Sequence, residues 1–280
     1  MNGGTTARWF LCVSSFCLSI AIPTAATAEK KTGAASNAEL VKKAQNPVAN
    51  LMSFPFQNNT DFGVGPTDQV ANTLNVQPVI PIGLGPVNLI TRTILPIASR
   101  PSGVTSTGNN EFGLGDMTAT IFAAPSAAGP VIWGVGPVFY FPTATSDSLG
   151  TAQFGVGPSF VVLGMPGDFV VGVLFNHIWS FAGKADRPNV NQTLVQYFIN
   201  YNLPNQWFIT ISPILTGNWE ITSGNKWTVP FGGGIGKLFR IGKLPINTII
   251  QGYGNVIKPT GGADATLRVQ IQFILPSIFS

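Results

Sequence analysis

Charged residues are scarce in this chain of 280 residues, at 9% against roughly 25% in an average soluble domain. Long apolar runs are also scarce, because outside the N-terminus none approaches the roughly 20 residues of a membrane-spanning helix. The hydrophobic content is nevertheless 45%, and glycine (32 residues) and proline (22 residues) are abundant. This combination disfavours a helical membrane protein and favours membrane-embedded strands, whose alternating residues keep the mean hydropathy low.

Cysteine and histidine are nearly absent, with two cysteines and one histidine in the whole chain. Both cysteines, Cys12 and Cys17, lie in an N-terminal segment in which Arg8 precedes an apolar run and small residues ending at Ala28 follow. This order predicts a signal peptide over residues 1–28, and the run is short for the alternative of a transmembrane anchor. The mature chain then has no thiol chemistry, and its single histidine predicts neither a metal site nor a cofactor.

An alternation of large apolar and small or polar residues runs from Ser53 to the end of the chain, with the period of two that is typical of strands. It is clearest in residues 131–164, where Trp-Gly-Val-Gly-Pro-Val-Phe (133–139) and Phe-Gly-Val-Gly-Pro-Ser-Phe (154–160) repeat one phrase. About twelve segments long enough to cross a bilayer follow this pattern. They are residues 53–64, 73–82, 88–98, 111–123, 131–142, 153–164, 168–181, 191–203, 206–218, 226–239, 246–258 and 265–275.

The connections between these segments alternate in kind. Residues 165–167, 204–205 and 242–245 form tight turns, whereas residues 100–110, 143–152, 183–190 and 219–225 form longer polar loops. Short turns at one end and longer loops at the other are typical of outer-membrane barrels, with the short turns on the periplasmic side.

The apolar face of these strands could face a soluble core or lipid, and three features favour lipid. Five tryptophans lie near predicted strand ends, the apolar faces carry almost no charge, and the signal segment gives a route out of the cytoplasm. The prediction is therefore an all-β fold, a transmembrane antiparallel barrel over residues 53–280 in the outer membrane. Its first strand must pair with its last, because the backbone N–H and C=O groups of an open sheet edge would have no hydrogen-bond partners in hydrocarbon. Prolines inside strands predict bulges or rim positions, and they are Pro78, Pro137, Pro158 and Pro213.

Residues 29–52 are expected to be a flexible segment with one short helix. Ser36 and Glu39 have the spacing of a capping box, which would open a helix through about Gln45, and Asn46-Pro47 would end it. Two interpretations stay open at this point. The favoured one is a linker helix at the barrel mouth, and the other is a small periplasmic plug that enters the lumen.

Several phrases in the chain resemble those of one bacterial outer-membrane protein family. They cover residues 56–60, 74–81, 88–94, 112–116, 132–137, 196–204, 224–234 and 268–273, and together they span nearly all of the mature chain. The family is labelled transporter-like or as a component of the MetA phenol-degradation pathway, and some members carry the misnomer neuromedin U. The resemblance implies an outer-membrane barrel with a transport role, and it supplies no substrate and no catalytic residue.

Charged and amide side chains inside the predicted strands are the candidate lumen residues. An arginine that faces lipid at the bilayer midplane costs roughly 2–4 kcal/mol, so these groups should point inward. There they can form satisfied interior ion pairs or line a pore and bias its selectivity. The candidates are Arg92, Asp116, Gln192, Gln196, Asn200, Gln251, Asn255, Arg268 and Gln270, with Gln77 and Thr118 beside them.

His177, the one histidine, shares its face with Phe175 and Trp179 and is expected at the outer rim of the barrel. Some membrane phospholipases use a histidine and a serine on the outer face of a barrel. Ser180 is three residues away and therefore on the opposite face, so an interfacial histidine is the favoured interpretation.

The leading functional hypothesis is a passive outer-membrane channel or facilitator for small molecules, apolar or aromatic ones among them. Its lumen would be narrow and partly plugged by the segment before Ser53. The alternatives are an outer-membrane lipid-modifying enzyme and a structural barrel without transport. The expected partners are outer-membrane lipid, a small solute and the barrel-assembly machinery. The net charge of +4 is spread without a basic cluster, so no nucleic-acid partner is predicted.

Overall fold

A computed structural model describes residues 37–127 and 129–275 of the chain. The predicted signal peptide and Ser36 of the predicted capping box lie outside these residues. The described chain forms one α-helix over residues 37–44, fifteen strand segments and two single-turn 3-10 helices. The strands are β1 (Met52–Val64), β2 (Gln69–Val76), β3 (Val79–Leu84), β4 (Val87–Arg100), β5 (Glu111–Leu114), β6 (Met117–Pro125), β7 (Val131–Phe141), β8 (Gln153–Gly164), β9 (Phe169–Gly183), β10 (Asn191–Asn202), β11 (Trp207–Ile211), β12 (Ile214–Asn218), β13 (Trp227–Ile241), β14 (Leu244–Ile257) and β15 (Ala265–Leu275). The 3-10 helices are η1 (Ser102–Val104) and η2 (Pro204–Gln206).

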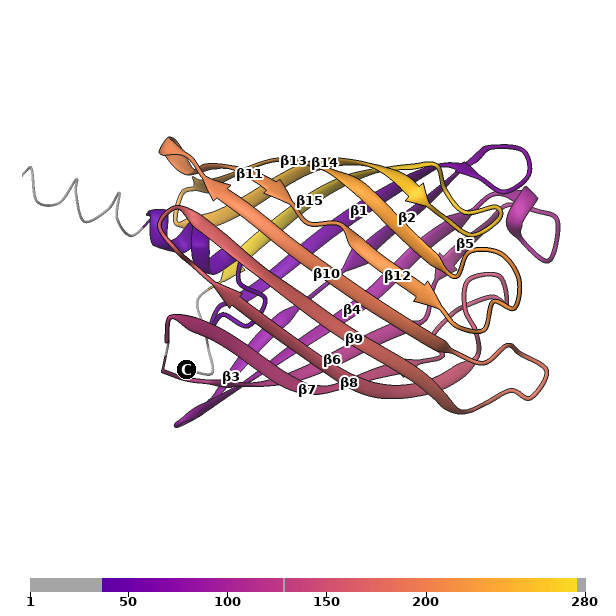
Figure 1. Cartoon of the computed structure of the whole chain (residues 1–280), viewed down its shortest axis with the longest axis horizontal. Coiled ribbons are helices and arrows are strands. Elements are labelled where there is room, and N and C mark those ends of the chain that lie inside the picture. Colours follow the sequence, from indigo (N-terminus) through magenta and orange to yellow (C-terminus); the bar gives the residue numbers. More distant parts are fainter. Residues whose placement is uncertain (1–36, 128, 276–280) are drawn as a thin grey trace, which may run out of the picture. The chain divides into compact units, whose positions relative to one another are not determined.

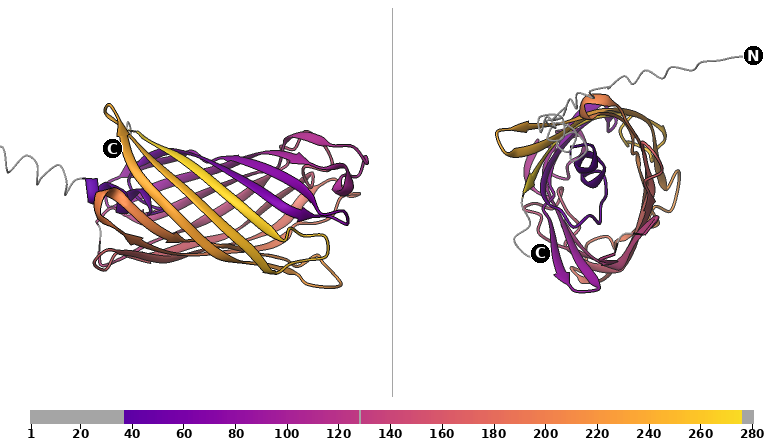
Figure 2. Two further views of the ribbon diagram at one scale, coloured as in Figure 1. Left: turned by 90° about the horizontal axis from the view of Figure 1, so that it is seen from above. Right: turned by 90° about the vertical axis from the view of Figure 1, so that its left-hand side faces the viewer.

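The strands form one closed antiparallel barrel of 12 crossings, because β2 with β3, β5 with β6, and β11 with β12 each make a single crossing (Figure 1). The first strand pairs with the last in an unbroken register from Met52 opposite Leu275 to Phe62 opposite Ala265. The ring is complete when seen along its axis (Figure 2). The predicted fold class, strand count and closure are confirmed.

Two strand breaks fall at prolines. β2 and β3 are separated at Gln77-Pro78, and β11 and β12 at Ser212-Pro213, because proline has no N–H to donate to the ladder. The expectation of a bulge or rim position was wrong for Pro137 and Pro158. They face each other in mid-strand without a register shift between β7 and β8. On their other sides, Pro137 has no paired residue on β6 and Pro158 has none on β9.

The connections are sorted between the two ends of the barrel as predicted, except for the four-residue connection 65–68 between β1 and β2, which lies at the same end as the longer loops. Residues 85–86, 165–168, 203–206 and 242–243 connect strands at one end, here called the turn end, where β1 begins. Residues 101–110, 142–152, 184–190, 219–226 and 258–264 form longer connections at the other end, here called the loop end. Short turns identify the turn end as the periplasmic one.

The outer surface of the barrel is an apolar band between two aromatic rims. On β7 and β8 the outward residues include Val135, Val156 and Phe160, which are between 37% and 48% exposed. Trp133 and Trp207 lie at the turn end, whereas Trp179, Trp219 and Trp227 lie at the loop end. Aromatic rims that border an apolar band mark the two interfaces of a bilayer. The chain is therefore an outer-membrane barrel. None of the helices in residues 37–127 and 129–275 is both long enough and apolar enough to cross a membrane.

Candidate functional site in the barrel lumen

Inward-facing side chains enclose three neighbouring cavities that share lining residues along the barrel. The turn-side cavity has an empty volume of about 950 Å³, the middle one about 1000 Å³ and the loop-side one about 920 Å³, and all three are open to solvent. Gln57 on β1 lines all three of them. The cavities thus adjoin one another from the loop end down to the N-terminal segment.

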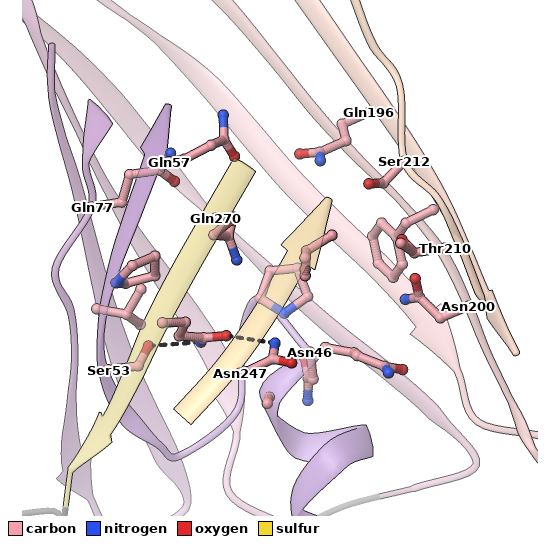
Figure 3. A pocket seen from close by; sticks show the side chains of 18 of the residues that line it. Asn46, Ser53, Gln57, Gln77, Gln196, Asn200, Thr210, Ser212, Asn247 and Gln270 are labelled. Atoms are coloured by element: carbon pink, nitrogen blue, oxygen red, sulfur yellow. Dashed lines mark hydrogen bonds between the residues drawn. The ribbon is translucent and has the colours of Figure 1, made fainter. Parts of the chain in front are cut away.

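The turn-side cavity is lined mainly by amides and hydroxyls (Figure 3). Gln272 donates to Ser53 Oγ at 3.1 Å and accepts from the Asn247 amide at 3.1 Å. Gln251 donates to Thr210 Oγ1 at 3.2 Å and to Ser212 Oγ at 2.8 Å. The Gln272 bonds join neighbouring strands, whereas the Gln251 bonds reach across β13 from β14 to β11 and Ser212. The polar wall of the lumen is therefore held in place by its own hydrogen bonds.

Two arginines line the same cavity. Arg92 Nη2 donates to Gln77 Oε1 at 2.9 Å, and Arg268 Nε donates to Asn59 Oδ1 at 3.0 Å. Arg268 Nη1 also donates to the Ser212 carbonyl at 3.1 Å. The strand break at Ser212-Pro213 leaves this carbonyl available, since Pro213 cannot continue the ladder.

One wall of the lumen near the turn end is apolar. Inward side chains of β4, β6, β8, β9 and β10 pack into a single buried cluster with Val48 of the N-terminal segment. The cluster comprises Val48, Ile90, Phe122, Ala124, Val161, Leu163, Val170, Leu174 and Phe198. Gly134 makes room for this contact, because a Cβ at that position would lie 3.1 Å from Val48 Cγ1. The lumen therefore combines a polar wall with an apolar one.

The N-terminal segment, residues 37–51, lies inside the turn end of the barrel (Figure 2). Its helix covers residues 37–44, and Val41 packs against Phe208, Leu238 and Ile274. Gln45 Nε2 donates to Asn202 Oδ1 at 2.9 Å.

Two further bonds tie the segment to the rim. Arg240 Nε donates to Asn37 Oδ1 at 3.3 Å, and Lys42 Nζ donates to the Gly167 carbonyl. The segment thus bonds to one turn and to the ends of β10 and β13, and it packs against two apolar clusters. Its residues form one side of the turn-side cavity.

The structure places most sequence-predicted candidates in these cavities. The turn-side cavity holds Gln77, Arg92, Gln196, Asn200, Gln251, Arg268 and Gln270, the middle one Thr118 and Gln192, and the loop-side one Asn255.

Asp116 lies apart from the other candidates, in the break between β5 and β6. Its carboxylate accepts from the Tyr140 hydroxyl at 2.8 Å, the Ala144 N–H at 3.1 Å and the Thr151 hydroxyl at 3.1 Å, and so fixes the loop over residues 142–152. Within the described part of the chain, Asp116 forms no ion pair with Arg92 or Arg268.

Several lining residues lie outside the predicted candidates, above all Gln57, Asn75 and Gln272. Gln272 shares the face of Arg268 and Gln270, so the period of two in β15 was sufficient to predict its inward position. In β1 the period is hidden, because polar residues occupy both faces.

The outward polar residues of β1 and β2 bond to one another. The Asn58 and Asn72 amides bond to each other at 2.9 and 3.0 Å, and the Asn72 amide also donates to Thr60 Oγ1 at 3.0 Å. This pairing satisfies polar groups on the lipid side.

His177 lies on the outer face near the loop end and joins a small polar cluster. Trp219 Nε1 donates to Thr193 Oγ1 at 2.8 Å, and the Thr193 hydroxyl also forms a hydrogen bond with His177 Nδ1 at 2.7 Å. His177 Nε2 donates to Asn191 Oδ1 at 3.1 Å. Ser180 points to the opposite face, as predicted, and bonds to the Val190 N–H at 3.0 Å. No group of three His, Cys, Asp or Glu side chains within the described ranges could hold a metal ion.

Comparison with known proteins finds similarity in structure only. No protein-family model and no curated protein sequence matches the chain. An outer-membrane channel from Pseudomonas putida F1 is similar at a TM-score of 0.61 and 14% identity, over 80% of this chain and 94% of that one. The NanC porin is similar at a TM-score of 0.48 and 10% identity, over 80% of this chain and 99% of that one. The Salmonella typhi outer membrane phospholipase dimer is similar at a TM-score of 0.44 and 13% identity, over 88% of this chain and 99% of that one. The first of these likenesses agrees with the fold described above, an outer-membrane β-barrel.

Proposed function

We propose that the protein is a passive channel for small molecules and that residues 37–51 close its turn end in the described state. The observation that carries this proposal is the series of three adjoining cavities around Gln57, from the loop end to the N-terminal segment. A barrel with a structural role alone has no need of an amide-lined interior, because apolar side chains fill a core with fewer unsatisfied polar groups.

The lining supports polar solutes more directly than apolar ones. The turn-side cavity has amide or hydroxyl groups on most of its wall, and such groups can exchange hydrogen bonds with a solute as it passes. Aromatic compounds, named above among the solutes of the channel hypothesis, are also candidates because one wall is apolar. The apolar wall around Phe122 and Phe198 could contact the ring of such a compound, while a polar substituent bonds to the opposite wall.

Reconstitution of the full chain tests the channel. We expect discrete conductance steps in planar bilayers and uptake of small solutes by proteoliposomes, with neither in protein-free membranes. The same preparation unfolded by boiling serves as the matched control. Folding of the preparation is verified by its heat-dependent gel mobility. A folded preparation that gives neither conductance nor uptake would refute the proposed channel.

A second candidate function rests on the outward cluster at His177. A hydroxyl, an imidazole and an amide carbonyl in sequence resemble the arrangement that activates a nucleophile in some hydrolases. Two features oppose it: Thr193 is only 7% exposed, and its strand pairs with β9 on one side and β12 on the other, so neighbouring N–H groups are not free to stabilise an oxyanion. We therefore expect no phospholipid hydrolysis. Hydrolysis that is abolished by both His177→Ala and Thr193→Ala would establish the enzyme instead.

A further inference from the structure

We propose that Arg92 and Arg268 make the turn-side cavity a binding site for a small carboxylate anion. This inference rests on the proposed channel function and deepens it, because it names the class of solute that the lumen would hold. Both side chains line the same cavity, together with amides from β1, β10, β14 and β15. Figure 3 shows one such amide from each of these strands, on Gln57, Gln196, Asn247 and Gln270.

Both guanidinium groups keep donors available for a ligand. A guanidinium has five N–H donors, and within the described residues Arg92 uses one of its nitrogens, in the bond to Gln77. Arg268 uses Nε and Nη1, and its plane lies 5.0 Å from the centre of the Tyr253 ring. Its Nη2 takes part in no bond to a described residue. Gln77 and Tyr253 therefore hold the two groups in place while leaving donors open.

Arg92 and Arg268 give the cavity positive charge without an ion-paired carboxylate. No described residue that lines the cavity is Asp or Glu, and Lys43, the third cation of the lining, is paired with Glu39 at 2.7 Å. The first carboxylate along the lumen is Asp61, in the loop-side cavity that Arg268 also lines, and it accepts from Thr266 Oγ1 at 2.6 Å. Uncompensated guanidinium groups within a membrane-embedded barrel require water or a counter-ion, so an anionic solute is the complementary ligand.

A carboxylate fits this site better than a spherical anion does. Guanidinium and carboxylate are both planar, and the pair can form two parallel charge-assisted hydrogen bonds. Gln57, Gln196 and Gln270 also line the cavity and offer donors and acceptors to the remainder of the solute.

Calorimetry on the full chain folded in detergent tests the site with succinate as the probe and its uncharged analogue succinamide as the control. We expect succinate to bind and succinamide to bind at least about tenfold more weakly. We expect Arg92→Gln and Arg268→Gln each to weaken succinate binding about tenfold, and Arg268→Lys, which keeps the charge, to weaken it less. Lys184→Gln removes the same charge from an exposed loop outside the three cavities and should leave binding unchanged.

Equal binding of the two probes, or equal effects of Arg268→Gln and Lys184→Gln, would overturn the proposal. If Arg268→Gln fails to fold, Arg92→Gln alone decides. Reversal potentials under a KCl gradient separate this inference from the channel itself. Conductance with anion preference that falls in Arg92→Gln supports both, and conductance without anion preference refutes only the carboxylate site. Succinate binding without any conductance refutes only the channel.

Discussion

The closure of the turn end predicts that weakening the contacts of residues 37–51 opens the channel more often. Val41 is 2% exposed and Val48 is 5% exposed, and they pack into two separate apolar clusters on the barrel wall. Truncating either to alanine removes buried methyl groups worth about 1.5 kcal/mol of docking free energy. That amount corresponds to about a tenfold rise in the undocked population for each substitution.

Because the two clusters do not share residues, the effects should add, and Val41→Ala with Val48→Ala should raise the undocked population about a hundredfold. The assay is single-channel recording in planar bilayers, with the fraction of time spent in the open state as the readout. Val256→Ala is the matched control, because it makes the same valine-to-alanine truncation at a residue that is 67% exposed on the outer surface.

An open fraction that does not change in the folded double variant would refute the reasoning. It would mean that the N-terminal segment does not limit passage, or that these two contacts do not hold it. A fall in conductance without a change in open fraction would also contradict the account, because it would indicate that the segment lines the passage instead of closing it.

The remaining predictions concern the barrel wall. Ile250→Arg, in the middle of the outer face, should lower the free energy of unfolding by about 2–4 kcal/mol, whereas Val256→Arg near the rim should lower it by about 1 kcal/mol or less. Urea titration in lipid vesicles measures both values, and equal losses would contradict a lipid-facing midplane. Gly236→Ala should lower stability by about 1–3 kcal/mol, because its Cβ would lie 2.1 Å from the Phe208 ring. Gly252→Ala, which has open space around the new Cβ, should be neutral in the same titration, and a cost as large as that of Gly236→Ala would refute the packing argument.

Much of the fold follows from the sequence because lipid imposes a simple pattern. In β8 every second residue from Phe154 to Val162 is exposed, and each residue between them is buried or half-buried. A period of two with bulk outside and small residues inside can be satisfied only by a strand between lipid and a narrow interior. Closure then follows from the need to pair every edge.

The inner wall was less predictable, because its partners come from distant parts of the chain. Arg268 bonds to Asn59 and to the Ser212 carbonyl, and neither pairing leaves a trace in local spacing. The position of the N-terminal segment likewise depends on Val41 meeting Phe208 and Ile274, far along the sequence. Sequence reasoning left the linker and the plug open for this reason.

Asp116 shows the limit of the alternation rule. Its parity with Thr118 predicts an inward carboxylate, and the sequence allowed an ion pair with an arginine. In the structure hydrogen bonds from Tyr140, Ala144 and Thr151 satisfy this carboxylate at the loop end. Parity predicts the face of a residue, and the partner depends on how a loop folds back.

The central claim is that the series of cavities along the lumen is the path of permeation. It is tested most directly at Gln57, which lines all three cavities. Residues 29–280 contain no cysteine, so Gln57→Cys places a single thiol in this part of the chain. A methanethiosulfonate reagent should then reduce the single-channel current, while Asn58→Cys on the outer face and Lys184→Cys in a loop should give channels that the reagent leaves unchanged. A current that persists at full size after verified labelling of Gln57→Cys would contradict permeation through this lumen.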